Sequence, residues 1–338
     1  MAPELIDLPG EADVHAAAER IAPFIRRTPV LTSRRLDEEL GARLYFKCEN
    51  FQSGGAFKAR GAFNALLSLP AEALKRGVVT HSSGNHGAAL ALAAARRGVP
   101  AWVVMPTDAP AFKRAMVARY GATVVDCAPG LANREEALAR LVERAGAATV
   151  HPYDDAAVIA GQGTAALELF EQAGRLDVLL APVGGGGLVS GCVLAGRSAC
   201  AETRIIAAEP AGADDCWQSL ERGERVRLEH VDTLADGLRA SIGIRNWALI
   251  SSGVEAVLRV EEHEIVAAMR CAWERLKVVI EPSAAVPLAA IFSGRLELAG
   301  LRVGVLLSGG NLDLDSLPGL FAVAATDQVL TGPSRPAR

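Results

Sequence analysis

Lys58 is the residue of this chain best suited to covalent chemistry. It lies in the stretch QSGGAFKARGA, residues 52–62, as a single amine among small residues and directly after the aromatic Phe57. A lysine must be neutral to form a Schiff base, and burial among apolar groups lowers its pKa. Backbone dipoles at the start of a helix also disfavour the ammonium form. A surface lysine on a helix is the plain alternative, and Lys58 alone does not exclude it.

A run of four glycines could bind an anion. It follows an expected apolar strand and precedes an expected helix, so its backbone N–H groups can converge on a phosphate with help from the helix dipole. Neither a G-x-G-x-x-G motif nor a Walker A motif fits the run. A phosphate loop is therefore favoured over a plain tight turn. The residues are Gly184, Gly185, Gly186 and Gly187.

A second loop, at residues 82–87, also connects an expected strand to an expected helix. Ser82, Ser83 and the adjacent N–H groups can hold a carboxylate, and Asn85 can donate a hydrogen bond to a phenolate oxygen. The alternative is an N-cap for the following helix, a position where Ser, Asn and Gly are common. The two roles are compatible with each other.

Ser308 ends a further strand, before Gly309, Gly310 and Asn311. A serine hydroxyl facing a pyridine nitrogen donates a hydrogen bond but does not protonate the ring strongly. That suits removal of an α-proton coupled to loss of a β-leaving group. A strand-end turn is the alternative. Taken together, the amine, the donors, the anion loop and this serine predict a site for pyridoxal phosphate (PLP).

Glu209 and Asp215, with a carbonyl between them, form a cluster of hard oxygen donors. Such a cluster suits Mg²⁺, Mn²⁺ or Ca²⁺ and not zinc. A solvated acidic turn explains the same residues equally well.

The composition is that of a globular enzyme of two domains. The chain has 338 residues, of which 50% are hydrophobic and 22% charged, which allows a large buried core. The net charge of −4 argues against nucleic-acid binding. Six scattered cysteines without C-x-x-C spacing indicate reduced thiols in a cytoplasmic protein. No signal peptide is expected, and no membrane span, because Pro182 and the glycine run interrupt the longest uncharged segment.

Strand and helix patterns alternate along the chain, which predicts an α/β fold with parallel sheets flanked by helices. We expect a large domain from residues 1–70 and 152–325, a small mobile domain from 71–151 and a disordered tail at 326–338. Ligands of such sheets bind at the carboxyl ends of the strands, so a cleft between the domains is expected. Helices are predicted at 13–25, 57–69, 86–97, 110–120, 133–145, 162–173, 188–198, 262–277 and 282–292, and strands at 43–48, 77–80, 101–105, 123–126, 148–151, 177–183, 204–208 and 302–307.

The motifs resemble those of the fold-type II PLP enzymes, which are tryptophan synthase β-like, and within them the serine racemases and serine/threonine dehydratases. The resemblance covers about residues 15–320. It is carried by residues 53–62, 80–87, 160–164, 182–187, 208–210, 213–216, 235–237, 280–282 and 307–311.

The resemblance implies a role for each motif. Lys58 would hold PLP and act as the base on one face of the substrate, and Ser83 would be the acid/base on the opposite face. Arg134 would lie near the substrate entrance, and the protein would be a homodimer. The cofactor would contact Phe57, Asn85, Ser308 and the four glycines. The substrate would contact Ser82, Ser83, Gly84, Asn85, His86 and Arg134. A divalent cation would bind Glu209, the Ala213 carbonyl and Asp215.

Some positions depart from the family pattern. Ala240 replaces a serine of the racemases, and Tyr153 replaces an asparagine of the mammalian forms. Ser53 stands where the nucleotide-activated enzymes have a lysine, and Ala88 replaces a glutamine, so the resemblance does not extend to activation by ATP.

Three functions are compatible with these residues. The first is a serine racemase that also eliminates the β-hydroxyl of serine to give pyruvate and ammonia, and Ser83 favours it. The second is a dehydratase (ammonia-lyase) acting on threonine or threo-3-hydroxyaspartate without racemisation, in which Arg134 could hold a second carboxylate. The third is a PLP-free binding protein that kept the fold.

Overall fold

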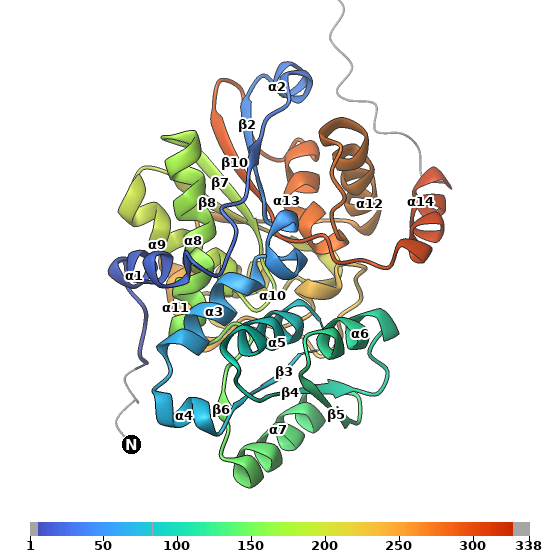
Figure 1. Ribbon diagram of the computed structural model, residues 1–338. Helices are drawn as coiled ribbons and strands as arrows, with labels where there is room; N and C mark the ends of the chain where they lie inside the picture. Colours follow the sequence, from blue (N-terminus) through green and yellow to red (C-terminus); the bar gives the residue numbers. More distant parts are fainter. Residues whose placement is uncertain (1–5, 83, 327–338) are drawn as a thin grey trace, which may run out of the picture.

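The structure is a computed structural model that describes residues 6–82 and 84–326 (Figure 1). Its strands form two sheets, one of six strands in the order β1-β2-β10-β7-β8-β9 and one of four in the order β5-β4-β3-β6. Neighbouring strands in the described ranges pair in parallel, except that β1 is antiparallel to β2. The predicted α/β fold of parallel-rich sheets flanked by helices is confirmed.

The six-stranded sheet is buried on both faces. Along β7, Val178 and Leu180 enter one apolar cluster, and Leu179 and Ala181 enter another on the opposite face. This alternation follows from the two-residue period of a strand, and burial of both faces is typical of parallel sheets. The strands are β1 (Val30–Leu31), β2 (Arg43–Cys48), β7 (Val178–Pro182), β8 (Arg204–Pro210), β9 (Ala256–Val260) and β10 (Arg302–Leu307).

Helices cover both faces of this sheet (Figure 1). Helices α8 and α9 contribute to the cluster on one face, and α12 and α13 to the cluster on the other. We call this sheet with its helices the large lobe. Its helices are α1 (Glu11–Ile21), α2 (Arg34–Leu40), α3 (Lys58–Ser68), α8 (Ala156–Ala173), α9 (Gly187–Ala199), α10 (Asp215–Arg222), α11 (Ile244–Gly253), α12 (Glu262–Cys271), α13 (Pro282–Phe292) and α14 (Leu317–Thr326).

The four-stranded sheet is the centre of a small lobe, drawn below the large lobe in Figure 1. Val78 and Val103 pack with Leu90 of α5 on one face, and Val79 and Val104 pack with Leu141 of α7 on the other. The elements of the small lobe are β3 (Val78–His81), β4 (Ala101–Pro106), β5 (Thr123–Cys127), β6 (Ala148–Thr149), α4 (Ala71–Lys75), α5 (Asn85–Arg97), α6 (Ala111–Arg119) and α7 (Leu131–Ala145).

Several predicted helix boundaries were wrong. The helix predicted at 162–173 begins at Ala156, because the carboxylate of Asp155 accepts a hydrogen bond from the Val158 N–H and caps it. The helix predicted at 13–25 ends at Ile21. The helix predicted at 262–277 becomes a π-helical turn after Cys271 and ends where Lys277 has a φ of 60°. Strand β9 and helices α2, α10 and α11 were not predicted.

The division into domains at residues 71 and 152 stays a prediction. Of the predicted tail, only Thr326, the last residue of α14, is described, and residues 327–338 lie outside the described ranges. Within those ranges, none of the helices combines the length and the apolar character needed to cross a bilayer.

A buried network of charges fixes helix α3 in the large lobe. The guanidinium of Arg60, fully buried, donates to Glu49 at 2.7 and 2.8 Å and to Glu168 at 2.8 and 2.9 Å. The buried ammonium of Lys47 donates to Glu168 at 2.6 Å. Because each charge has hydrogen-bonded partners, burial is tolerated, and the position of α3 is strictly defined. Lys58 is the first residue of α3, so the same network also fixes the backbone position of Lys58.

Candidate active site

Lys58 lies at the junction of the two lobes. Phe57 is the N-cap of α3, and its N–H donates to the Ser308 carbonyl at 2.9 Å, which places Lys58 beside the end of β10. The Lys58 ammonium donates to the Pro152 carbonyl at 2.9 Å and lies 5.0 Å from the centre of the Phe57 ring. Burial lowers the pKa of Lys58 to about 8, although the carboxylate of Glu281 acts in the opposite direction. A neutral amine is therefore accessible near neutral pH.

The four glycines connect β7 to α9 and are too closely surrounded to carry side chains. A Cβ on Gly185 would lie 2.3 Å from the Tyr153 ring, and a Cβ on Gly184 would lie 2.8 Å from the Leu238 Cα. Gly186 has a φ of +96°, which side chains disfavour. Asn246 holds the loop in place, because its amide donates to the Gly185 carbonyl at 2.8 Å. We call residues 184–187 the glycine cradle; it fits a phosphate group.

Ser308 and the glycine cradle are brought together by strand order. Ser308 follows β10 and Gly184 follows β7, and these strands are parallel neighbours in the sheet. Both residues therefore lie at the carboxyl edge, where α/β sheets bind their ligands. Ser308 is 2% exposed. Lys58, Ser308 and the cradle fit the aldehyde, ring nitrogen and phosphate of PLP.

The loop of residues 82–87 begins at the end of β3. Gly84 is the N-cap of α5, and its N–H donates to the Ser82 hydroxyl at 3.2 Å. His86 is 2% exposed, and neither of its ring nitrogens has a hydrogen-bond partner among the described residues. Burial keeps the pKa of His86 well below its usual range. The predicted acid/base Ser83 lies outside the described residues, so its role stays a prediction.

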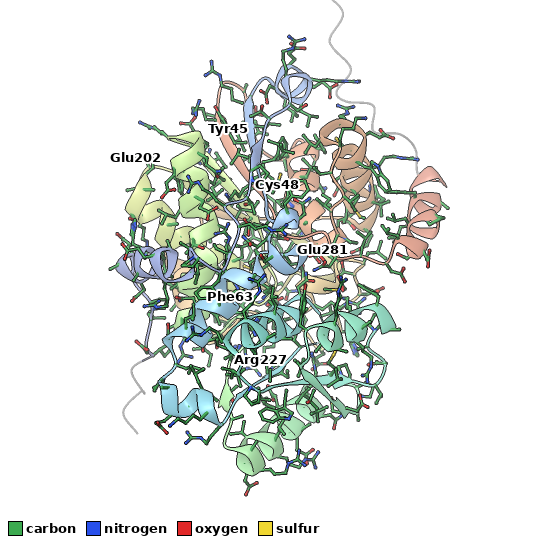
Figure 2. The ribbon with its side chains drawn as sticks, in the orientation of Figure 1. Tyr45, Cys48, Phe63, Glu202, Arg227 and Glu281 are labelled. Atoms are coloured by element: carbon green, nitrogen blue, oxygen red, sulfur yellow. The ribbon has the colours of Figure 1, made fainter. Side chains whose placement is uncertain are left out.

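Glu281 is a site residue whose role the sequence reasoning missed. It lies in the middle of the molecule, between the two lobes (Figure 2), and is 3% exposed. Its carboxylate accepts hydrogen bonds from the Asn85 amide at 2.8 and 3.1 Å, while the Asn311 amide donates to the Asn85 oxygen at 3.0 Å. Burial raises the pKa of Glu281 to about 7. The motif Ile280-Glu281-Pro282 had marked the position without a role.

The rings of His81, His151 and Tyr153 form a cluster beside the glycine cradle, where Tyr153 lies against Gly185. The rings of His81 and His151 are 5.5 Å apart, and those of His151 and Tyr153 are 4.7 Å apart. Burial lowers the pKa of His81 to about 4, with a smaller effect from the charges of His151 and Arg134. Arg134 itself is half-buried on α7 and donates to the Gly130 carbonyl of its own helix at 3.4 Å. No described hydrogen bond joins Arg134 to Lys58 or to the loop.

The predicted metal ligands also come together. Glu209 is 1% exposed, and its carboxylate accepts hydrogen bonds from the N–H groups of Trp217 at 2.7 Å and Cys216 at 3.3 Å. Asp215 is 3% exposed and accepts from the Ile242 N–H at 2.8 Å. Burial and mutual repulsion raise the pKa of Glu209, and burial raises that of Asp215 to about 6.

This donor set fits a hard cation. In the described ranges, neither carboxylate has an ion pair with Lys or Arg, and no group of three His, Cys, Asp or Glu side chains could hold a metal. The set therefore consists of two carboxylates and the Ala213 carbonyl. A cation of the Mg²⁺ or Ca²⁺ type would stabilise two buried acids that have no described cationic partner, and its presence stays a prediction.

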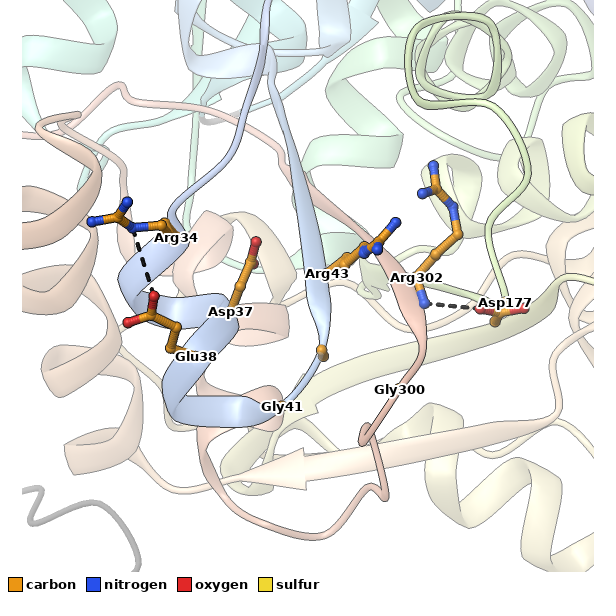
Figure 3. Close-up of a pocket in the computed structure, with 9 residues that line it drawn as sticks. Arg34, Asp37, Glu38, Gly41, Arg43, Asp177, Gly300 and Arg302 are labelled. Carbon is orange, nitrogen blue, oxygen red and sulfur yellow. Dashed lines mark hydrogen bonds and ion pairs between the residues drawn. The ribbon is translucent and has the colours of Figure 1, made fainter.

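A cavity of about 660 Å³ lies at the opposite end of the large sheet, where β2 and β10 begin (Figure 3). Within this cavity Arg34 pairs with Glu38, and the backbone N–H of Arg302 donates to the carboxylate of Asp177 at 2.8 Å. None of the predicted site residues lines it. The chemistry predicted from the sequence therefore belongs to the carboxyl edge of the sheet.

Comparisons with known proteins identify the family of this chain. A family model described as pyridoxal-phosphate dependent enzyme matches residues 21–309. β-Hydroxyaspartate dehydratase of Paracoccus denitrificans is 48% identical over 311 residues, which are 92% of this chain and 99% of the relative. Serine racemase of Arabidopsis thaliana is 48% identical over 309 residues, 90% of this chain and 93% of the relative. The structure of maize serine racemase superposes with a TM-score of 0.90 at 42% identity and covers 95% of this chain and 99% of that one.

The family model covers Lys58, the loop of residues 82–87, the glycine cradle and Ser308. The resemblance inferred from the sequence motifs is confirmed, both for the fold-type II fold and for an enzyme of the racemase and ammonia-lyase kind. The chain belongs to the pyridoxal-phosphate dependent enzymes.

Proposed function

We propose that this protein is a serine racemase that interconverts L- and D-serine and also eliminates water from serine, giving pyruvate and ammonia. The observation that carries the proposal is the position of Lys58, a desolvated amine directly after Phe57, whose N–H donates to Ser308 at the same edge of the sheet as the glycine cradle. The 48% identity to the racemase of Arabidopsis thaliana supports it. Family membership argues against a PLP-free binding protein.

PLP, when bound, supplies an aldehyde for the substrate amine and a ring that stabilises negative charge at the α-carbon. The glycine cradle would hold its phosphate, Ser308 its ring nitrogen, and Phe57 and Asn85 its ring. Glu281 and Asn311 fix the Asn85 amide from both sides, so its nitrogen is directed as a donor. For this nitrogen to donate to the phenolate oxygen of the ring, one of its two hydrogen bonds to Glu281 would have to open.

The substrate carboxylate would bind the loop through Ser82, Ser83, Gly84, Asn85 and His86. Lys58 would remove the α-proton on one face of the substrate, and Ser83 would return a proton on the opposite face. When the β-hydroxyl leaves instead, protonated as it departs, the products are pyruvate and ammonia. Desolvation around Lys58 favours its neutral form and hence its action as a base.

A second function is supported by a different observation. The β-hydroxyaspartate dehydratase of Paracoccus denitrificans is also 48% identical to this chain. A substrate with a second carboxylate needs a further cation, and Arg134 on the small lobe would supply it. In this alternative the protein is an ammonia-lyase for threo-3-hydroxyaspartate or threonine, without a racemase role.

We also propose a divalent cation, Mg²⁺, Mn²⁺ or Ca²⁺, on Glu209, the Ala213 carbonyl and Asp215. Its support is that Glu209 and Asp215 are buried carboxylates that have no ion pair with Lys or Arg among the described residues. Assembly as a homodimer and a cytoplasmic location stay predictions from the sequence.

One set of incubations separates these functions. The PLP-loaded enzyme is given L-serine, L-threonine or L-threo-3-hydroxyaspartate, and the keto acid and the D-amino acid are measured. We expect D-serine and pyruvate from L-serine, and we expect Ser83→Ala to abolish D-serine while it spares pyruvate. Lys58→Ala should abolish both products. Keto acid without any D-serine from the unmodified enzyme would remove the racemase and favour the ammonia-lyase.

A further inference from the structure

Lys113 is a small-lobe lysine with an unusual position. It belongs to α6, its side chain is only 12% exposed, and its ammonium forms an ion pair with Asp236 of the large lobe. Burial lowers the pKa of Lys113, the charge of Glu281 raises it, and the charge of Arg239 lowers it further. A lysine kept this far from water needs an anionic partner in every state of the enzyme.

The ammonium of Lys113 lies over the loop that is proposed to hold the substrate carboxylate. A Cβ built on Gly84 would lie 3.7 Å from the Lys113 Nζ and 3.8 Å from its Cδ. Gly84 is the N-cap of α5, a helix of 13 residues, so the first N–H groups of that helix have no partner within it. Among the residues that the structure describes, the ring nitrogens of the buried His86 in the same turn also have no hydrogen-bond partner.

Asp236, the present partner, sits on a short turn between two parts of the cofactor site. This turn, η4 (Asp236–Leu238), touches the glycine cradle, because a Cβ on Gly184 would lie 2.8 Å from the Leu238 Cα. It also touches α13, because the Gly237 N–H donates to the Ser283 hydroxyl at 2.9 Å. The Lys113 ammonium therefore lies between the loop of residues 82–87 and a turn that contacts the glycine cradle.

The exposed fractions of Asp236 and Lys113 indicate which of the two can leave the ion pair at lower cost. The Asp236 side chain is 32% exposed, whereas that of Lys113 is 12% exposed. A released Asp236 is hydrated at little cost, but a released Lys113 would be a buried charge that keeps only the longer-range attraction of Glu281. The pair should therefore open only when another anion takes the place of Asp236.

We infer that Lys113 is a further substrate-binding residue, whose ammonium receives the α-carboxylate of the amino acid in exchange for Asp236. The inference rests on the proposed function, because it requires that the loop of residues 82–87 binds that carboxylate. It adds to that function a cationic contact, and it assigns Asp236 as the group that neutralises Lys113 between turnovers.

The test compares an acid with its amide. 3-Hydroxypropionate and 3-hydroxypropionamide are serine-like ligands without an amino group, so neither reacts with PLP, and their binding to the PLP-loaded enzyme is measured by calorimetry. Lys113→Met should weaken binding of the acid about 10-fold or more, as expected for a lost charged hydrogen bond, and should change binding of the amide less than about twofold. The KM for L-serine should rise by a similar factor, with kcat little changed.

Matched variants separate this role from a structural one. Lys75→Met removes an exposed small-lobe lysine that pairs with Glu72 at 2.6 Å, and it should leave both affinities unchanged. Lys113→Arg should restore most of the binding of the acid, and Lys113→Gln replaces Lys113→Met should that variant not fold. Asp236→Asn should tighten binding of the acid, because the competing carboxylate is gone.

Equal loss of acid and amide in the Lys113→Met variant, or no loss of either, would overturn the inference. Unchanged or weaker binding of the acid by Asp236→Asn would contradict the exchange. Failure of the proposed function looks different, since the unmodified enzyme would then form no product from serine and would not prefer the acid over the amide.

Discussion

At the scale of single residues, the site depends on charges removed from water. Lys58, Glu281 and His86 all lie within a few residues of an element end, and for each the largest cause of the shifted pKa is burial. The shifts have opposite signs, because burial favours the neutral form of both bases and acids. Near neutral pH the site therefore contains a Lys58 close to deprotonation and a Glu281 close to protonation, a combination suited to proton transfer.

The pKa of Lys58 leads to a prediction about cofactor uptake. Only the neutral amine attacks the aldehyde of PLP, and burial lowers the pKa of Lys58 from its usual 10.5 to about 8. The uptake rate of the cofactor-free protein should therefore rise about tenfold per pH unit below pH 8 and level off above it. Absorbance in stopped flow measures this rate.

Charged and titratable groups from several elements act on Lys58. Glu281 at the start of α13 raises the pKa of Lys58. The charge of Lys58 in turn contributes to the lowered pKa values of His86 and His151. A lysine peptide in water is the control for the profile, and its reaction with PLP should keep accelerating towards pH 10.5. A protein profile that follows the peptide would show that Lys58 is not desolvated.

At the scale of elements, the turn between β7 and α9 is defined by what lies against it. Tyr153 presses its ring on Gly185 and also packs edge-on against His151 at 4.7 Å, so it cannot move away easily. The Asn246 amide closes the turn from the other side, donating to the Tyr153 carbonyl at 3.0 Å and to that of Gly185. The cradle is therefore rigid before any phosphate arrives, which limits the entropy lost on binding.

Gly185→Ala tests this rigidity. The added Cβ would lie 2.3 Å from the Tyr153 ring, which packs against His151, so we expect a loss of about 1–3 kcal/mol in stability and a larger loss of PLP affinity. Thermal unfolding and titration with PLP measure the two effects.

Gly196→Ala is the matched control in the helix that follows the cradle. Its Cβ would meet only the flexible end of Ile205 at 3.2 Å. Replacing a glycine inside a helix by alanine stabilises the folded protein by about 0.5–1 kcal/mol. PLP affinity should stay as it is. Normal cofactor binding by Gly185→Ala would show that the phosphate does not use this turn.

At the scale of the whole molecule, two lobes meet around a polar seam. Asn85 of the small lobe binds Glu281 and Asn311 of the large lobe, and Lys113 pairs with Asp236. The cofactor residues, in contrast, belong mainly to the large lobe, where the buried charges of Arg60 and Lys47 hold α3 against α8. We therefore propose that the large lobe holds the cofactor and that the small lobe contacts the substrate.

The proposed cation should stabilise the large lobe as a whole. A ligand that binds only the folded state adds about 2.7 kcal/mol of stability at 100 times its Kd, so EDTA should lower the Tm by a few degrees in a preparation saturated with Mg²⁺. Glu209→Gln should abolish this response, because it removes one of the two buried carboxylates. Differential scanning calorimetry with and without EDTA gives the result.

Glu202→Gln is the control for the cation, because Glu202 lies on the surface of the same lobe (Figure 2). That variant should respond to EDTA as the unmodified protein does. Equal Tm values with and without EDTA in the unmodified protein would leave Glu209 and Asp215 as structural acids only.

Features that depend on neighbouring residues could be predicted from the sequence. The glycine cradle was predicted because a turn without side chains between a strand and a helix is a local pattern. Lys58 and Ser308 were predicted because each ends or starts an element beside glycines. Strand β9 was missed because it lies at the edge of its sheet and only Val257 and Val260 are buried, so its pattern is weak. The start of α8 was missed because burial on most sides leaves no helical period.

The sequence by itself determined the α/β fold, the lysine and the loops of a PLP enzyme, since hydrophobic period and turn chemistry act over a few residues. The tertiary structure alone decided that Glu281 fixes Asn85, that Tyr153 covers Gly185 and that Lys113 reaches Asp236. These partners are far apart along the chain, and no local propensity relates them. They meet because the packing of two sheets and their helices brings distant segments within hydrogen-bonding distance.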